Sequence, residues 1–322
     1  MVPMTRITLR QLEYFRTIAA TGSLRAAAER EYVSRSTIAA ALTDLERALD
    51  TQLCIRHKST GIELTESGKA VLDIAATIGG YVDDLESLAG DSTLKGILTV
   101  GCFGSLAPTV LPTLVKQFMA DHPGVEVVTV TDSTDVLIDL LTSGRLDLII
   151  SYKLHVVPAL TVRRLFETRM YVVLPPEHRL AAGDVVDAAD LVHEPLVMIT
   201  TPPSEEDVTD YFDSIGLSPH VRFRISNFEY GRSLIAAGLG YGLYLQRPLH
   251  DLTYEGAPLV AKPLRPMPTS ERVSIAWPRD RRLTAKASSF VELTQSWGAR
   301  LAPVSVYDGR TDAESGASAV ED

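Results

Sequence analysis

The chain opens on apolar positions that recur every three or four residues. In the first of these runs the apolar residues are Leu9, Leu12, Phe15 and Ile18. This spacing places them on one face of a helix. Gly22 follows where a helix C-terminus favours a left-handed residue, and Ser23 is placed to cap a second, alanine-rich helix that extends to about Glu31. The pattern therefore predicts two short helices joined at Gly22.

A third helix is predicted to begin at Ser34, after a tight turn. Its apolar residues recur at intervals of four, three and four, and they are Ile38, Leu42, Leu45 and Leu49. The opposite side carries Arg35, Ser36, Thr37, Ala39, Ala40 and Thr43. A tight turn before an amphipathic third helix is typical of the helix-turn-helix, whose last helix enters a DNA major groove. The alternative is a three-helix packing unit that contacts no DNA.

The segment from Asp50 to Gly68 is predicted to form a two-stranded wing. Basic side chains within it, at Arg56, His57 and Lys58, would lie where the phosphates of a bound duplex run. The residues predicted to contact DNA are Ser23, Ser34, Arg35, Ser36, Thr37, Thr43, Arg56 and Lys58.

Several stretches of this region resemble the N-terminal domain of the LysR-type transcriptional regulators. They are LRQLEYF at 9–15, GSLRAAAE at 22–29, the VS before the third helix, LTDLE at 42–46 and LTESG at 64–68. The likeness extends to about Leu301, by layout more than by motif. It implies a ligand-responsive regulator that binds double-stranded DNA as a homodimer or homotetramer, responds to a small-molecule effector and contacts RNA polymerase.

The third helix departs from the usual pattern of that family. Arg35 and Ser36 stand where members usually have Gln-Pro, and Ala39 to Ala41 stand where they often have Ser-Arg-Gln. Cys54 replaces a usual Phe. Three polar groups that could reach bases or phosphates are therefore absent, so we expect modest specific affinity. The alternative function is a cytoplasmic small-molecule binding protein with lost or weakened DNA binding.

A heptad pattern follows between Thr65 and Ala89. Its apolar seam consists of Val71, Ile74, Ile78, Tyr81, Leu85 and Leu88. Such a seam is typical of a helix that pairs with another helix. The alternative is a single long helix that packs on its own domain. The resemblance favours pairing with the same helix of a second copy, which implies an interrupted, roughly palindromic operator.

From Gly96 onward, strands and helices alternate. The first predicted strands are 97–101, 125–130 and 146–150, and the helices between them are 107–121 and 134–143. This order predicts a βαβαβ unit with a parallel sheet. A second such region is predicted from about 169 to 264, with strands at 171–174, 196–199 and 221–225 and helices at 205–215 and 228–237. A strand at 273–277 and a helix at 284–297 then return to the first unit.

The predicted fold class is α+β and multi-domain. It combines an N-terminal winged helix-turn-helix, all-α with a small β wing, a long linker helix and a C-terminal two-lobed α/β effector domain that resembles periplasmic binding proteins. The predicted boundaries are 1–65 for the DNA-binding domain, 66–95 for the linker and 96–302 for the effector domain. Within the effector domain, lobe one is 96–168 with 266–302, and lobe two is 169–265. Residues 303–322 are predicted to form a disordered acidic tail.

Two lobes joined by two crossings enclose a cleft. In open α/β sheets, ligands lie at the carboxyl ends of strands and near helix N-termini. This rule selects as effector-binding residues Ser105, Ser133, Thr134, Tyr152, Thr200, Thr201 and Phe228. For each hydroxyl the alternative is a helix N-cap that contributes about 1 kcal/mol of stability and no function. Asp132 and Asp135 crowd one of these loops, so a neutral or cationic effector is compatible with it.

Charge constrains the DNA interpretation. The whole chain has a formal net charge of −10, whereas residues 1–65 carry nine Lys and Arg against seven Asp and Glu. An acidic protein repels DNA at long range and needs a local basic patch, doubled by dimer symmetry. We therefore expect binding that weakens steeply with salt.

Enzyme chemistry finds little support in the sequence. The seven histidines lack metal-ligand spacing, and the GLGYG run at 238–242 lacks the order of a dinucleotide-binding loop, so it predicts a helix-to-strand turn. We predict no enzyme activity, no cofactor and no metal. Cys54 and Cys102 are expected to be reduced thiols, with a redox pair as the alternative. No signal peptide or membrane span is found, which predicts a cytoplasmic protein without a membrane partner.

Overall fold

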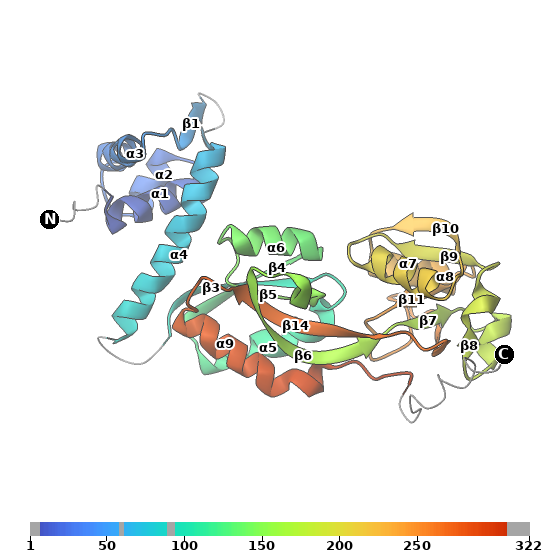
Figure 1. Cartoon of the computed structure of the whole chain (residues 1–322). Helices are drawn as coiled ribbons and strands as arrows, with labels where there is room; N and C mark the ends of the chain where they lie inside the picture. Colours follow the sequence, from blue (N-terminus) through green and yellow to red (C-terminus); the bar gives the residue numbers. More distant parts are fainter. Residues whose placement is uncertain (1–6, 58–60, 89–93, 308–322) are drawn as a thin grey trace.

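The computed structural model describes residues 7–57, 61–88 and 94–307. Figure 1 shows a helical N-terminal domain, a long helix that leads away from it, and a C-terminal part in which two lobes lie side by side. This arrangement confirms the predicted fold class. Within the described ranges, no helix is both long enough and apolar enough to span a bilayer.

The N-terminal domain packs three helices around one core. They are α1 (Leu9–Thr21), α2 (Leu24–Arg30) and α3 (Arg35–Leu49). Gly22 ends α1 with a φ of 63°, and Ser23 caps α2 by accepting a hydrogen bond from the Ala26 backbone N–H, as predicted. Phe15, Ile18, Ile38, Leu42 and Leu45 fill the core. Burial of the apolar face of α3 leaves its polar side free to face a partner.

The wing is an antiparallel pair of β1 (Cys54–His57) and β2 (Gly61–Leu64). It is attached to the α1–α2 turn, because the Ile62 backbone N–H donates to the carbonyl oxygen of Gly22 at 2.8 Å. Gly61 permits this approach, since a Cβ there would lie 2.6 Å from that oxygen. The wing ends at Leu64, and Gly68 belongs to the next helix rather than to the wing.

Helix α4 (Glu66–Leu88) links the two parts of the chain and runs without interruption through Gly79 and Gly80. Its N-terminal half packs on the N-terminal domain, where Ala75 is buried in the core. Its C-terminal half contacts the effector part, because the Tyr81 hydroxyl donates to the carbonyl oxygen of Arg282 at 2.9 Å. The helix therefore contacts both parts of the same chain.

Lobe one is built on a mixed sheet in the order β4-β3-β5-β14-β6. Its strands are β3 (Gly96–Phe103), β4 (Val125–Asp132), β5 (Leu148–Tyr152), β6 (Leu160–Arg169) and β14 (Ser270–Pro278). Strand β3 pairs in parallel with β4 and β5, and β14 lies antiparallel beside β5, which confirms the predicted return to the first unit. Helices α5 (Ala107–Asp121) and α9 (Ala285–Trp297) pack on one face and α6 (Thr134–Thr142) on the other.

Lobe two contains three small sheets and two helices. Strand β7 (Tyr171–Leu174) pairs antiparallel with β11 (Gly242–Tyr244) and β12 (Val260–Lys262), β9 (Pro195–Ile199) pairs in parallel with β10 (His220–Ile225), and β8 (Val186–Asp187) pairs with β13 (Leu264–Arg265). The helices are α7 (Ser204–Ser214) and α8 (Phe228–Ala236). Short 3-10 helices lie at Leu154–Val156, Arg179–Ala182, Ala188–Leu191 and Gly298–Leu301.

The prediction of a second fully parallel unit is wrong for its first strand, β7. A parallel neighbour needs a crossover connection, usually a helix. Both neighbours of β7, the strands β11 and β12, run antiparallel to it, although α7 and α8 lie between β7 and β11 in the chain. The GLGYG run forms the predicted helix-to-strand turn, with Gly238 at a φ of 77°.

Two strands, β6 and β14, cross between the lobes and pair with each other along their whole length. We call this pair the β6–β14 ribbon. Its register shifts between Val273 and Ser274, which leaves Leu165 of β6 as an extra residue. Such a bulge bends a strand and increases its local twist.

The first residues of the predicted disordered tail are folded, which corrects the prediction for 303–307. Residues 303–307 pack against lobe two, and Tyr307 is buried there. Its hydroxyl donates to the carbonyl oxygen of Met170 at 2.7 Å and accepts from the Leu264 backbone N–H at 2.9 Å. Burial of the Tyr307 ring with its hydroxyl hydrogen-bonded contributes favourable free energy that offsets the entropy cost of ordering this segment. Residues 308–322 lie outside the described part of the chain.

Candidate DNA-binding surface and effector cleft

The first turn of α3 carries a cluster of exposed hydroxyl groups. The Ser34 hydroxyl accepts from the Thr37 backbone N–H at 3.1 Å and lies 2.7 Å from the Ser36 hydroxyl. Arg35 is exposed beside them, and Thr43 is exposed two turns further along. The Ser and Thr hydroxyls can donate or accept hydrogen bonds, and the Arg35 guanidinium can donate them. The polar side of α3 is therefore accessible to a duplex.

Of the other predicted DNA contacts, one caps a helix and two have side chains outside the described residues. Ser23 is half-buried and its side chain caps α2, which is a structural task. Arg56 lies on β1 opposite Ile62, and its side chain is outside the described residues. Lys58 also lies outside the described residues.

A residue that the sequence reasoning missed joins α3 to the wing. The Glu46 carboxylate accepts hydrogen bonds from the backbone N–H groups of Leu53 at 2.8 Å and Cys54 at 3.2 Å. This contact fixes the wing relative to α3. The LTDLE motif contains Glu46, but its hydrogen-bond partners lie seven and eight residues away and could not be read from helical spacing.

The predicted pairing seam of α4 is divided between two surroundings. Val71 and Ile78 are half-buried against the N-terminal core, and Tyr81 contacts the effector part. Ile74 and Leu85 are 59% and 65% exposed. The side chain of Leu88 is outside the described residues. Part of the seam thus packs within the chain, and part stays open for a partner.

A cavity of about 480 Å³ lies between the two lobes. Its walls combine strand ends and helix N-termini of both lobes, the arrangement expected of a ligand cleft in a two-lobed α/β protein. Five of the predicted effector residues line it, namely Ser105, Ser133, Tyr152, Thr201 and Phe228. We call it the effector cleft.

Two predicted effector residues are not in the lining. Thr134 is buried, and its hydroxyl lies 2.6 Å from the Ser151 hydroxyl. The Thr200 hydroxyl donates to the carbonyl oxygen of Ile225 and ties β9 to β10. Both hydroxyls serve the fold of their own lobe, although neither is the helix N-cap that the sequence offered as the alternative.

Aromatic rings form much of the wall. Phe103 and Tyr152 of lobe one meet edge to face with ring centroids 5.4 Å apart, and Phe228 and Tyr244 of lobe two do the same at 4.9 Å. Such edge contacts fix ring orientation. The cleft therefore has a rigid apolar surface on both sides.

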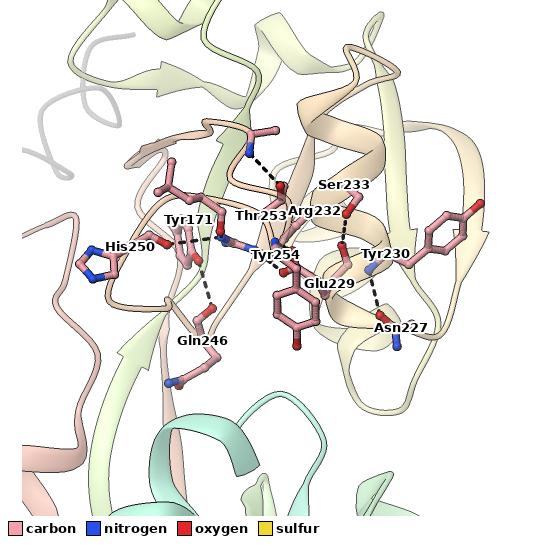
Figure 2. A network of polar contacts seen from close by, with 12 residues as sticks. Tyr171, Asn227, Glu229, Tyr230, Arg232, Ser233, Gln246, His250, Thr253 and Tyr254 are labelled. Atoms are coloured by element: carbon pink, nitrogen blue, oxygen red, sulfur yellow. Dashed lines mark hydrogen bonds and ion pairs between the residues drawn. The ribbon is translucent and has the colours of Figure 1, made fainter.

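The buried side chain of Arg232 fixes part of the cleft wall in lobe two, through the network of polar contacts drawn in Figure 2. Arg232 is 1% exposed and donates to Glu229 at 3.0 Å and to the carbonyl oxygen of Leu252 at 2.7 Å. The second Glu229 oxygen accepts from the Tyr254 backbone N–H at 2.6 Å. A buried charge is stable only when it is paired and hydrogen-bonded in this way. The network fixes the segment that carries Gln246 and Tyr254 into the lining.

Polar side-chain atoms without a hydrogen bond gather around the effector cleft. In the described part of the chain, such buried atoms belong to Tyr241, Tyr244 and Gln246, and the last two residues line the cleft. An unsatisfied buried polar group costs about 1–3 kcal/mol. Their concentration at one cavity is what a site built for a polar ligand would require.

A lysine from lobe one pairs with acids from lobe two at the edge of the cleft. Lys153 forms an ion pair with Asp207 and lies 3.7 Å from Asp210. Burial raises the pKa of Asp207, and Lys153 opposes this shift. Burial and the charge of Asp207 also raise the pKa of Glu271 on β14. The carboxylates of Asp207, Asp210 and Glu271 therefore all interact with one ammonium group, that of Lys153.

The two cysteines lie in different hydrophobic cores, Cys54 in the N-terminal domain and Cys102 in lobe one. They therefore form no disulfide with each other. Burial raises the pKa of the Cys102 thiol, which keeps it protonated and unreactive.

Comparison with known proteins agrees with both parts of this description. Residues 9–69 match the family of bacterial regulatory helix-turn-helix proteins of the LysR type, and residues 91–299 match the LysR substrate binding domain. The chain belongs to the LysR family of transcriptional regulators. The resemblance stated from the sequence motifs is thereby confirmed, and the chain is a ligand-responsive DNA-binding regulator by family.

Similar LysR-family proteins cover most of the chain. The transcriptional activator CmpR of Synechocystis is 26% identical over 90% of this chain and 95% of its own. The structure of HinK from Pseudomonas aeruginosa is 30% identical, covers 92% of this chain and 100% of its own, and superposes with a TM-score of 0.62. The C-terminal domain of a probable LysR-family regulator from Rhodococcus is 38% identical over 62% of this chain and 98% of its own, with a TM-score of 0.60.

Proposed function

We propose that the chain binds an interrupted palindromic operator through α3 and the wing, and that a small-molecule effector in the interlobe cleft changes this binding. The observation that carries the proposal is the exposed polar first turn of α3 on a helix whose apolar face is buried. A duplex can therefore reach Ser34, Arg35, Ser36, Thr37 and Thr43 without any rearrangement of the domain.

The proposed mechanism couples lobe closure to the position of the DNA-binding units. Helix α4 contacts the N-terminal domain and, through Tyr81, the effector part. A ligand that favours closed lobes changes the surface on which α4 rests and so shifts the paired DNA-binding units. Pairing of α4 between copies, through Ile74 and Leu85, gives the homodimer, and two dimers give a homotetramer.

The remaining assignments follow from this role. A DNA-binding regulator acts on the chromosome, so we place the protein in the cytoplasm. Contact with RNA polymerase would change transcription of the target genes. We assign no catalytic activity and no cofactor. The domain boundaries proposed are those predicted above, with the effector domain extended to Tyr307, whose ring is buried in lobe two.

Gel-shift titration against the upstream region of its own gene tests the DNA-binding surface. Arg35→Ala should weaken specific binding by about tenfold, as expected when a groove contact is lost. Arg47→Ala is the matched control, because Arg47 is exposed at the far end of α3 and pairs with Asp44. Equal affinities for the two variants would remove Arg35 from the surface. Selection from random duplexes should enrich a palindrome, and no enrichment would favour the small-molecule binding alternative.

Thermal unfolding tests the cleft. A deproteinised extract of cells that carry the gene should raise the melting temperature of the full chain by binding the folded state. Ser133→Phe, at the start of α6, places a ring in the cleft lining and should abolish the shift. Ser143→Phe, at the other end of α6, is outside the cleft lining and should preserve it. A shift that survives Ser133→Phe would place the effector elsewhere.

A further inference from the structure

We propose that the effector cleft selects a ligand whose head group is a protonated amine. The proposal rests on the function proposed above for this cleft. Three features of the wall support it: its charged side chains, its helix ends and its aromatic rings.

The charged side chains of the wall all have one sign. In the described part of the chain, those that line the cleft are Asp132, Asp207 and Glu229. Lys153 and Arg232 pair with the latter two but contribute nothing to the lining. Both ion pairs therefore turn their negative ends toward the ligand. A cation gains Coulomb energy from this orientation, and an anion loses it.

Helix N-termini at the cleft would by themselves attract an anion. In lobe one, however, the Asp132 carboxylate accepts from the Ser133 backbone N–H at 2.8 Å, directly before α6. Three of the four helices that begin at the cleft carry acids in their first turns, namely Asp135 in α6, Glu205, Glu206 and Asp207 in α7, and Glu229 in α8, whereas α5 carries none. These charges compensate the dipoles of α6, α7 and α8 and reduce their attraction for an anionic ligand.

The rings supply the third feature. The edge-to-face pairs Phe103–Tyr152 of lobe one and Phe228–Tyr244 of lobe two line the cleft, and Tyr254 adds a further ring to the lining. Aromatic faces attract cations, most strongly where water is excluded. A cavity of about 480 Å³ with such walls fits a compact amine with an apolar body.

Ion-exchange fractionation of the active cell extract tests the charge of the natural ligand. At neutral pH, the activity that raises the melting temperature should be retained by a sulfonate resin and pass through a quaternary ammonium resin. Retention by the quaternary ammonium resin, or passage through both, would overturn the amine. An unfractionated extract without activity would instead count against the cleft as an effector site, and the amine would fall with it.

A matched set of probes tests the head group directly. Phenethylamine, phenethyl alcohol and hydrocinnamate share one ring and differ in the end group. Calorimetric titration of the full chain should rank the amine first. Asp132→Asn keeps an oxygen acceptor for the Ser133 N–H but removes the charge, so amine affinity should fall about threefold while alcohol affinity stays unchanged. Asp121→Asn, exposed at the end of α5 and outside the lining, is the control.

Three outcomes would overturn the proposal. They are binding of hydrocinnamate as tight as that of the amine, an equal loss for all three probes in Asp132→Asn, and no binding by any of the three. Circular dichroism of Asp132→Asn should match that of the wild type. This last measurement separates the loss of a charge in the cleft from a defect in folding.

Discussion

The Glu46 side chain connects a helix to a wing that the sequence treats as separate elements. Its carboxylate is the acceptor for two backbone N–H groups, of Leu53 and Cys54, in residues that are almost fully buried. Charged acceptors form stronger hydrogen bonds than neutral ones, and a buried N–H without a partner is costly. The position of the wing relative to α3 thus depends on Glu46.

Glu46→Ala should lower the free energy of unfolding of the N-terminal domain by about 2 kcal/mol, because two N–H groups lose their acceptor. Glu46→Gln keeps an acceptor oxygen and should cost about half as much or less. Urea unfolding followed by circular dichroism measures both. Asp44→Ala serves as control, since the exposed Asp44–Arg47 pair should contribute under about 0.5 kcal/mol. Equal losses for Glu46→Ala and Asp44→Ala would contradict this role.

Some apolar residues of helix α4 pack within the chain, and others on the same helix are exposed. Its inner residues pack against the N-terminal core, while Ile74 and Leu85 stay exposed although they are large and apolar. Isolated exposed apolar residues are ordinary, but two of them on one heptad seam favour a partner helix.

Ile74→Asp should therefore convert the oligomer to smaller species, because a charge in a helix seam loses its hydration without gaining a partner. Sedimentation velocity measures the change, and circular dichroism should show an unchanged helix content. Lys69→Asp introduces the same side chain on the opposite side of α4 and should leave the assembly intact. An unchanged sedimentation coefficient for Ile74→Asp would place the dimer contact on another element.

The helices of the N-terminal domain could be predicted to within about a residue, because caps and apolar spacing are local signals. Strand β6 was not predicted. Its sequence mixes three arginines with apolar residues, and it becomes a strand only by pairing with β14, more than a hundred residues later. The direction of β7 was wrong for the same reason, since strand pairing depends on connections far along the chain.

The effector cleft was predictable in part. Ser105, Ser133 and Thr201 follow strands, and strand ends are where such sites lie. Gln246 and Glu229 entered the lining through the Arg232 network, which joins α8 to a distant irregular segment. No spacing rule connects those positions, so only the three-dimensional arrangement reveals them.

For the molecule as a whole, pH should act through the acids shared between the lobes. The pKa of Glu271 is raised by burial and by the charge of Asp207. A carboxyl group whose pKa is higher in the folded state stabilises the fold fully below its unfolded value, and this contribution is lost as pH rises through the folded value. The stability contributed by Glu271 should therefore decline from about pH 4 upward.

Glu271→Gln removes that decline. The variant should gain stability relative to the wild type as pH rises from about 4 toward neutrality, and the two curves should run parallel above the raised pKa. Urea unfolding at a series of pH values measures the difference. Glu167→Gln, a change of an exposed acid on the neighbouring strand β6, is the matched control variant. A constant difference between wild type and Glu271→Gln would contradict the assignment.

The β6–β14 ribbon also determines how the lobes can move. Because its strands stay hydrogen-bonded to each other between the lobes, an opening motion has to twist the ribbon, and the bulge at Leu165 is where it bends most easily. Such a twist stores elastic energy in the ribbon. Amide hydrogens beside Leu165 should therefore exchange with deuterium faster than the rest of the ribbon, and the lobes should return to their resting angle without any further input once the cavity empties.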